Sequence, residues 1–313
     1  MFKFKHLIIL SLTLVVLTIS GCKSRFEEIR LSNDVTKKYQ EAINLYNKKS
    51  YSKALVLFED LSQKYRGQQQ AEDLNYYYAY TLYRLKDYTT ARFQFKYFAD
   101  NYPNSPNAEE CRYMSAFCYY LDSPDSPLDQ ENTYKAIDAL QLFINLYPSS
   151  NRASQASDYI TILRGKLELK AFDNAKMYYL MGDYDVSNYK SAVIALKNIQ
   201  IDYPDIKYSD EIHFLIFKSQ YLFAKNSLVA RQEDRYNEAL GYYAEYAENF
   251  PEGAFKKEAE QLKEATVKEI ADAKKELAEI ATQEAQMKEL RDKAAAQDSL
   301  NKVKTIKTPK NNG

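Results

Sequence analysis

The chain has 313 residues, of which 45% are apolar, so it is long enough to bury a sizeable core. Lysine and arginine balance aspartate and glutamate at 43 each, so no basic excess points to a nucleic-acid partner. Tyrosine is unusually common (29), tryptophan is absent, and there are only 7 glycines and 8 prolines. Such a composition fits helices joined by short turns and argues against a sheet protein rich in tight turns.

Residues 1–21 have the pattern of a lipoprotein signal peptide. Two early lysines precede the apolar run 7–19, which is too short to span a bilayer comfortably. The run ends in Ile19-Ser20-Gly21-Cys22, which resembles a bacterial lipobox, in which the cysteine is lipidated and becomes the mature N-terminus. We therefore predict lipidation at Cys22; the alternative is an ordinary signal peptide with an incidental cysteine. The residue after this cysteine is Lys23. An aspartate at that position would favour retention in the inner membrane, so the lysine indicates the outer membrane as the destination. Residues 22–34 then form a lipidated tether.

The rest of the chain follows a helical hairpin that is clearest in residues 75–103. That stretch predicts two amphipathic helices, broken at Lys86-Asp87 and stopped at Tyr102-Pro103, because proline cannot continue the helical ladder. The second helix of the hairpin recurs as aromatic, small, large apolar, large apolar, aromatic-proline, except that the first repeat has Arg66 in place of the proline and the third has Thr133 in place of the first aromatic residue. Its five occurrences are Tyr51/Ala54/Phe58/Leu61/Tyr65, Tyr88/Ala91/Phe95/Phe98/Tyr102, Thr133/Ala136/Leu140/Phe143/Tyr147, Tyr189/Ala192/Leu196/Ile199/Tyr203 and Tyr236/Ala239/Tyr243/Tyr246/Phe250. Such self-similarity at a period near 34 residues is typical of tetratricopeptide repeats.

The pattern predicts an all-α tetratricopeptide-repeat solenoid of five helical hairpins with a long C-terminal helix. Repeats 1–3 occupy residues 35–150, and repeats 4–5 with a long linking helix occupy residues 151–253. Residues 254–300 predict a charged helix whose first part caps the solenoid. Its remainder is either a solvated helix or a short coiled coil, and the solvated helix is favoured. Residues 301–313 predict a disordered basic tail.

Residues 122–132 separate the two helices of the third repeat and contain two prolines and four acidic residues. This composition predicts a solvated loop. Long ordered loops are often functional and often merely tolerated, so a role in binding a partner stays open.

Nothing in the sequence supports an enzyme, a metal site or a cofactor. His213 is the one histidine outside the signal peptide, and it lies on an apolar helix, where a packing role is the usual one. Cys111 and Cys118 lie seven positions apart on one predicted helix, roughly 10 Å along its axis and beyond disulfide reach. We interpret them as small buried residues. No glycine-rich phosphate loop is present.

The candidate site is therefore a surface. In a tetratricopeptide stack the first helices of the hairpins line the concave face, where tyrosine offers a large contact area with a polar tip. The peptide-groove candidates are Tyr76, Tyr80, Arg84, Tyr113 and Phe117. The alternative is that the tyrosines belong to the core, and this is the favoured interpretation for Tyr83, Tyr120 and Tyr179.

The lipobox, the five repeats and the long linking helix together resemble the BamD family of lipoproteins of the outer-membrane β-barrel assembly machine. The stretch KLELKAFDNAKMYYLMGDY at 166–184, leading to IDYPD at 201–205, is similar to the family's fourth repeat. The resemblance covers residues 22–253, and the C-terminal helix and tail exceed the usual family length.

The resemblance implies a non-enzymatic scaffold anchored through Cys22 in the outer membrane and facing the periplasm. It implies an N-terminal half that faces unfolded outer-membrane proteins and a C-terminal half that docks an Omp85-type, BamA-like barrel-forming subunit. Another envelope scaffold, such as a cell-division or Tol-Pal coordinator, usually carries a coiled coil before the repeats and lacks a lipobox. A surface nutrient-binding lipoprotein typically binds glycans through tryptophan, which this chain lacks.

Overall fold

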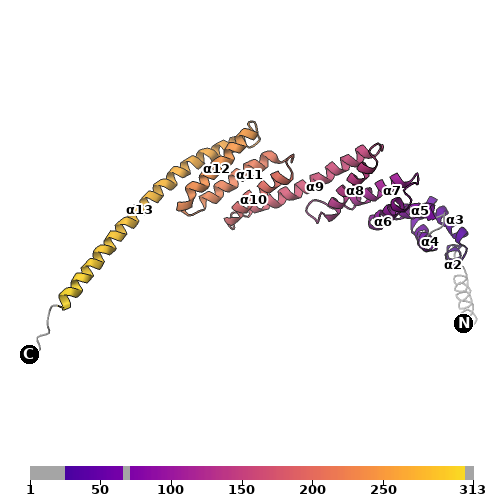
Figure 1. Ribbon diagram of the computed structural model, residues 1–313, viewed down its shortest axis with the longest axis horizontal. Coiled ribbons are helices and arrows are strands. Elements are labelled where there is room, and N and C mark those ends of the chain that lie inside the picture. The colour runs from indigo at the N-terminus through magenta and orange to yellow at the C-terminus, as the bar shows by residue number, and fades with distance from the viewer. Residues whose placement is uncertain (1–24, 66–70, 307–313) are drawn as a thin grey trace, which may run out of the picture. The chain divides into compact units, whose positions relative to one another are not determined.

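The computed structural model describes residues 25–65 and 71–306, and helices joined by turns and loops are its only regular secondary structure over those residues (Figure 1). The predicted all-α fold is confirmed. The helices are α2 (Arg25–Leu31), α3 (Val35–Asn47), α4 (Tyr51–Lys64), α5 (Ala71–Arg84), α6 (Tyr88–Asn101), α7 (Ala108–Leu121), α8 (Glu131–Leu146), α9 (Ala153–Leu180), α10 (Ser187–Asp202), α11 (Ser209–Lys225), α12 (Val229–Asn249) and α13 (Lys256–Ile306). The predicted signal peptide and Cys22 lie outside the described residues.

Five hairpins follow one another, formed by α3 and α4, α5 and α6, α7 and α8, α9 and α10, and α11 and α12. In the first two, a lysine turns the chain in the left-handed conformation, Lys49 at φ 59° and Lys86 at φ 63°. The residue after each lysine donates its amide hydrogen back across the helix end, from Ser50 to the Leu45 carbonyl and from Asp87 to that of Leu82. This geometry is a Schellman motif, which satisfies carbonyls that the helix end would leave unbonded.

The chain divides into two compact units, Met1–Leu167 and Glu168–Gly313. In the first unit, α3, α4 and the start of α5 close on one apolar cluster that includes Leu57 and Phe58. Helices α5 to α8 and the first part of α9 close on a second cluster around Phe95 and Phe143. Both clusters have fully buried alanines at the helix contacts, Ala79 among them, where a larger side chain would keep the helices apart.

In the second unit, the last part of α9 packs with α10 and α11 around Leu196. Helices α11, α12 and the start of α13 lie side by side and share a cluster around Phe217 and Tyr236 (Figure 1). Ala192, predicted to lie at a close helix contact, is fully buried on α10.

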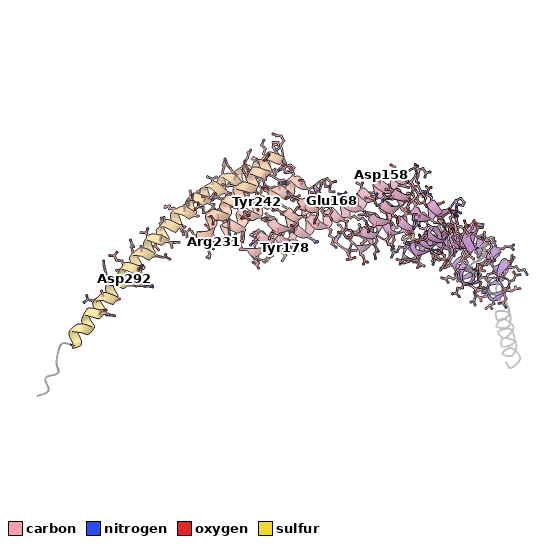
Figure 2. The ribbon with its side chains drawn as sticks, in the orientation of Figure 1. Asp158, Glu168, Tyr178, Arg231, Tyr242 and Asp292 are labelled. Atoms are coloured by element: carbon pink, nitrogen blue, oxygen red, sulfur yellow. The ribbon has the colours of Figure 1, made fainter. Side chains whose placement is uncertain are left out.

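Helix α13 has two parts. Its first turns pack on α11 and α12, with Ala259 and Thr266 fully buried. After Ala273, every residue through Ser299 is exposed, and Figure 2 shows side chains such as that of Asp292 standing away from the helix. The helix continues to Ile306, so the first residues of the segment predicted to be disordered are helical; residues 307–313 lie outside the described residues.

The structure also modifies two other predicted segments. Part of the predicted tether is helix α2, and its side chains Phe26 and Ile29 pack against the first apolar cluster. The predicted loop at 122–132 is shorter by two residues, because α8 begins at Glu131.

Candidate functional site

Half-buried aromatic rings run across the first helices of the hairpins in the first unit. We call Tyr46 on α3, Tyr83 on α5, Phe117 and Tyr120 on α7, and Tyr159 on α9 the aromatic strip. The ring centroids of Tyr83 and Phe117 are 6.5 Å apart, those of Phe117 and Tyr159 5.4 Å, and those of Tyr120 and Tyr159 4.2 Å. The last two pairs are stacked, so three helices present one nearly continuous aromatic surface.

One cation lies on the aromatic strip. Arg84, the last residue of α5, is exposed, and its guanidinium lies 5.8 Å from the ring centroid of Tyr83. Its hydrogen bond with the Tyr46 hydroxyl raises the pKa of Arg84, so it carries its charge at every physiological pH. Among the described residues no carboxylate forms a salt bridge with Arg84, and a guanidinium has five N–H donors. Donors therefore remain for an anionic partner.

Tyr80 and Tyr113 are anchors beneath this surface, which corrects their prediction as groove-lining residues. They are only 8% and 3% exposed. Their rings pack edge-on against the core, 5.0 Å from Phe95 and 5.4 Å from Phe143 between centroids. Burial raises the pKa of Tyr113 to about 12 and raises that of Tyr80 further, so both hydroxyls stay protonated as hydrogen-bond donors.

These two hydroxyls tie together the helices that present the strip. The hydroxyl of Tyr80 on α5 donates to Glu110 Oε1 on α7 at 2.5 Å, and that of Tyr113 on α7 donates to Gln155 Oε1 on α9 at 2.8 Å. Arg152 lies 4.5 Å from the Tyr113 ring centroid and 3.4 Å from Glu110 Oε1. The three first helices are therefore cross-linked by polar contacts, which favours a preorganised surface.

The structure thus brings together only part of the predicted groove. Phe117 lies at the centre of the aromatic strip and Arg84 at its edge, while Tyr76 is half-buried with its ring 4.8 Å from that of Tyr80. Tyr83 and Tyr120, predicted to be core, are half-buried and pack against the core cluster of the first unit, so each ring also has an accessible part. Tyr179 is likewise half-buried against a core cluster of the second unit.

Sequence reasoning missed Tyr46 and Tyr159 as members of the strip. For Tyr46 a signal was available, because Tyr46, Tyr83 and Tyr120 recur at a spacing of 37 residues on three successive first helices.

The loop at residues 122–130 is held firmly on the first unit. Buried Gln130 donates from Nε2 to the carbonyls of Asp125 at 2.8 Å and Leu128 at 3.0 Å. Lys166 on α9 donates from Nζ to the carbonyls of Ser123 and Pro124, both at 3.1 Å. The loop is therefore ordered rather than simply solvated, and its role in binding a partner stays a prediction.

The histidine and the two cysteines of the described residues have packing roles. His213 lies 2.8 Å from the Ser209 carbonyl through Nδ1 and packs against Phe250 at 5.0 Å. The Cys111 and Cys118 thiols are buried, and burial raises the pKa of Cys118 to about 12 and that of Cys111 further. In residues 25–65 and 71–306, no group of histidine, cysteine or acidic side chains is arranged to hold a metal ion. Over the same residues, no helix has the length and apolarity to cross a membrane.

The structure has five helical hairpins with alanine at the helix contacts. In four of them the second helix ends at an aromatic residue followed by proline. These features define the class of protein, which is a tetratricopeptide-repeat protein. Comparison with known families is more specific. The YfiO family, described as outer membrane lipoprotein, matches residues 32–211. This match covers more than half of the chain and all the residues of the aromatic strip, and the chain belongs to this family. YfiO is the family domain of BamD, so the resemblance in the sequence is supported at the level of the family.

No curated protein gives a significant match to the chain. Among solved structures, the chain is similar to the crystal structure of a thermophilic TPR protein in Thermus thermophilus, at 17% identity over 74% of this chain and 98% of that one. The TM-score is 0.29.

Proposed function

We propose that this protein is a non-enzymatic scaffold of outer-membrane β-barrel assembly. In this proposal it is anchored through lipid on Cys22, faces the periplasm, and binds unfolded outer-membrane proteins on the aromatic strip. It also docks an Omp85-type barrel-forming subunit through its second unit. Family membership supports the outer-membrane lipoprotein part of this proposal.

The observation that carries the binding role is the aromatic strip with Arg84 at its edge. An extended peptide with alternating aromatic residues can lay its rings on the half-buried rings of Tyr83, Phe117 and Tyr159. A terminal carboxylate would then reach the exposed guanidinium of Arg84, which is geometrically suited to bidentate carboxylate binding. Unfolded β-barrel chains, which end in alternating aromatic residues, have both features.

The test of this role is a titration of the full chain with a fluorescent peptide that has alternating aromatic residues and a free C-terminal carboxylate. We expect a Kd in the micromolar range or weaker, because ordering a flexible peptide uses much of the contact energy. Replacing both residues, Arg84→Ala and Phe117→Ala, should weaken binding by about tenfold or more, which corresponds to about 1.4 kcal/mol.

Two controls make this test specific. Phe93→Ala changes an exposed ring on α6, away from the strip, and should leave the Kd unchanged. With a C-terminally amidated peptide, Arg84→Ala alone should have no effect, because the carboxylate it contacts is gone. Unchanged binding by a folded double variant would remove the aromatic strip from consideration.

The anchor has its own prediction. Cys22→Ser removes the acceptor thiol, so we expect the protein to lose its acyl group and to appear in the soluble periplasmic fraction. Fractionation and metabolic labelling with palmitate measure this directly. Label that persists on Cys22→Ser protein would show that the lipid is attached elsewhere.

Exposed apolar side chains in the second unit support the docking role. They are Met177, Tyr178, Leu180, Met181 and Tyr184, which cluster at the end of α9 and in the following turn (Figure 2 labels Tyr178). Tyr184 is 92% exposed, and a concentration of large apolar side chains on one element is typical of an interaction surface.

Affinity purification in mild detergent with mass spectrometry tests the docking role. We expect an Omp85-type barrel protein as the main partner of the native chain. Replacing Tyr178→Glu and Tyr184→Glu together should release this partner, because both rings are exposed and a charge would be desolvated at the interface. Leu290→Glu, at an exposed position of α13, is the matched control. A barrel partner that is missing from the native sample, or that stays with the double variant, would contradict this docking surface.

A further inference from the structure

A pocket opens at the junction of α12 and α13 in the second unit, and none of the functions proposed above uses it. Its volume is about 190 Å³. Its lining residues are Tyr243, Tyr246, Ala247, Phe250 and Pro251 from α12 and the turn after it, and Lys256 and Glu260 from the start of α13. Pockets for drug-sized ligands have volumes of about 300–1,000 Å³, so this one suits a single ring.

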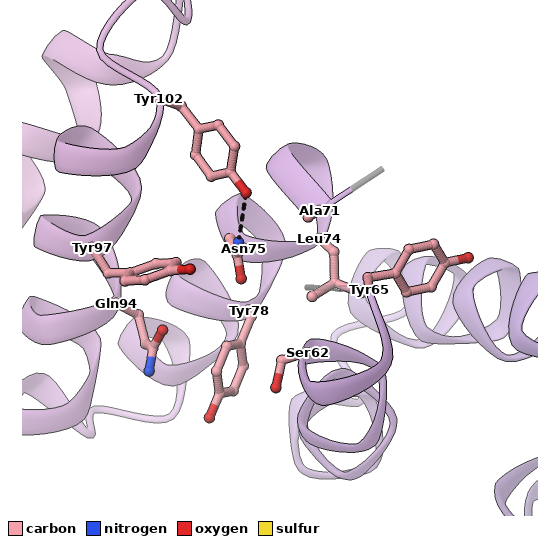
Figure 3. Close-up of a pocket in the computed structure, with 9 residues that line it drawn as sticks. All are labelled: Ser62, Tyr65, Ala71, Leu74, Asn75, Tyr78, Gln94, Tyr97 and Tyr102. Atoms are coloured by element: carbon pink, nitrogen blue, oxygen red, sulfur yellow. Dashed lines mark hydrogen bonds between the residues drawn. The ribbon is translucent and has the colours of Figure 1, made fainter. Parts of the chain in front are cut away.

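The repeat places an equivalent junction between α4 and α5, where the next helix contributes aromatic rings. Counted from the residue at the proline position of each repeat, Asn75 on α5 corresponds to Glu260 on α13. Figure 3 shows that α6 lines this junction with the rings of Tyr97 and Tyr102. The Tyr102 hydroxyl accepts a hydrogen bond from Nδ2 of Asn75 at 3.2 Å. A tyrosine at the end of α6 therefore bonds to the side chain at the position of Glu260.

The junction between α10 and α11 is covered in a similar way. His213 is at the position that corresponds to Glu260, and Gln200 is at that of Ala247. Nε2 of Gln200 lies 2.9 Å from Nε2 of His213, so a long side chain stands where α12 has only alanine. The ring of Phe250, at the end of α12, packs on His213 with 5.0 Å between centroids. In both junctions an aromatic residue at the end of the next second helix contacts the side chain at this position.

The junction of α12 and α13 has no such cover among the described residues. Helix α13 runs without a break to Ile306, so no second helix follows it there. The residues at the third position of the other four second helices are fully buried: Phe58, Phe95, Leu140 and Leu196. At the same position Tyr243 is only half-buried, and Ala247 and Glu260 are exposed. Residues 256–313 contain no aromatic residue, so they cannot supply the ring.

The walls and the rim of the pocket favour a ring that donates one hydrogen bond. Three aromatic residues, a proline and an alanine form apolar walls. At the rim, the Glu260 carboxylate can only accept hydrogen bonds, and it forms no ion pair with the described residues. The neighbouring cation Lys256 is already bonded, from Nζ to Glu252 Oε1 at 3.1 Å. A phenyl ring would shield Glu260 from water without bonding to it, and a cation alone would leave the apolar walls uncovered.

We propose that this junction is a docking site for a partner protein that inserts a tyrosine ring from the end of a helix. The ring lies against the apolar walls of the pocket, and its hydroxyl donates to the Glu260 carboxylate. Tyrosine is among the residues that most often anchor protein interfaces by filling a pocket. The site shares no residue with the aromatic strip or with the exposed apolar side chains at the end of α9.

NMR of the full chain with 13C-labelled alanine methyl groups tests the pocket, with p-cresol as the probe for a tyrosine side chain. The Ala247 methyl group lines the pocket, and that of Ala285, on the exposed part of α13, is the internal reference. We expect p-cresol at millimolar concentration to shift the Ala247 signal and to leave that of Ala285 unchanged. The anion 4-methylbenzoate should shift neither, because its carboxylate would meet that of Glu260.

Substitutions at exposed positions separate binding from folding, with the affinity measured by ligand-observed saturation-transfer NMR. Glu260→Ala should weaken p-cresol binding by about fivefold, because the hydroxyl loses its charged acceptor, and should leave toluene binding unchanged. Ala247→Leu fills the pocket and should abolish binding of both probes. Ala244→Leu, at an exposed position of α12 outside the lining, should change neither. All three variants should keep their affinity for the aromatic peptide, which separates this inference from the role of the aromatic strip.

A photoreactive amino acid at Ala247 of the full-length protein tests the partner in living cells. We expect a crosslink to another protein, mapped by mass spectrometry to a helical segment with a tyrosine next to the crosslinked residue. Adding Glu260→Ala should weaken this crosslink, and the photoreactive amino acid at Ala285 should not give it.

Three results would overturn the inference. The first is that p-cresol does not shift the Ala247 methyl signal, or that it binds Glu260→Ala protein as well as the parent. The second is that butylamine shifts this signal at lower concentration than p-cresol, which would make the pocket a site for a cation. The third is that Ala247 gives no crosslink, or crosslinks only to a second copy of this chain or to a segment without tyrosine.

Discussion

Replacing Asp60 by alanine is expected to destabilise the first hairpin more than any other surface substitution in the first unit. Lys38 on α3 is only 2% exposed, and its ammonium lies 2.5 Å from Asp60 Oδ2 on α4. Without Asp60 a buried cation has no counter-charge, a loss that costs about 3–5 kcal/mol in proteins. Because the Asp60 side chain is 39% exposed and water can screen part of the charge, we expect about 3 kcal/mol.

Two variants define this effect. Lys38→Met removes the cation itself and should change the free energy of unfolding little or raise it, since replacing a buried ion pair by an apolar residue is often neutral or stabilising. Glu131→Ala removes one partner of an exposed pair with Lys135 and should cost less than about 1 kcal/mol. Urea denaturation and hydrogen exchange of α3 and α4 provide the measurements. If Asp60→Ala lowers the free energy of unfolding no more than Glu131→Ala does, the ion pair with Asp60 does not stabilise buried Lys38.

The same pair predicts a dependence on pH. The hydrogen bond from Lys38 is the largest cause that lowers the pKa of Asp60 below its ordinary value near 3.8. A carboxyl whose pKa is lower in the folded state stabilises the fold above its unfolded pKa, and this stabilisation is lost as pH falls through the folded pKa. The contribution of Asp60 is therefore complete at about pH 5 and above, begins to fall near pH 4, and is lost only below the folded pKa, which lies under 3.8.

Gly182→Ala is the second substitution expected to have a large effect, in the second unit. A Cβ atom at Gly182 would lie 2.1 Å from the ring of Tyr189, which is 3% exposed and donates from its hydroxyl to Asp183 Oδ1 at 2.6 Å. The ring would have to leave its packed position and lose this bond. We expect a loss of about 3 kcal/mol, the upper end of the range for overpacking.

Gly165→Ala is the matched control for this substitution. Gly165 lies inside α9, and a Cβ atom there would meet nothing within 4 Å. Alanine at an interior helix position is about 0.5–1 kcal/mol more favourable than glycine, so this variant should be more stable than the parent. Thermal denaturation measures both variants. A lower melting temperature for Gly182→Ala and a higher one for Gly165→Ala would confirm the packing at Gly182. Equal, small changes in melting temperature would show that the Tyr189 ring can move freely.

The hairpins could be predicted because each depends on residues close in sequence. Alanine at helix contacts, aromatic-proline at helix ends and a period of 3.6 residues are local signals, and they placed Ala79 and Ala192 in the core. The left-handed lysines at the first two hairpin turns were not predicted, although the 37-residue spacing of Lys49 and Lys86 follows the repeat.

The depth of each tyrosine could not be predicted in the same way. Tyr80 and Tyr83 are one turn apart on α5, and the helical period places both towards the neighbouring helices. Which ring turns inward depends on partners far away in the sequence, Glu110 and Phe95 for Tyr80. Tyr159 was missed because it follows Tyr120 by 39 residues instead of 37, so it falls outside the series of Tyr46, Tyr83 and Tyr120.

Site-specific photo-crosslinking in living cells tests the binding role of the aromatic strip most directly. A photoreactive phenylalanine analogue is placed at Tyr83, Phe117 or Tyr159 of the full-length protein, and at Phe93 and Leu290 as exposed positions off the strip. We predict crosslinks from the three strip positions to newly made outer-membrane proteins near their C-terminal ends, and none from the two controls. Crosslinks to these proteins from the controls alone, or from neither set while the protein is folded and membrane-anchored, would contradict the proposal that the aromatic strip binds them.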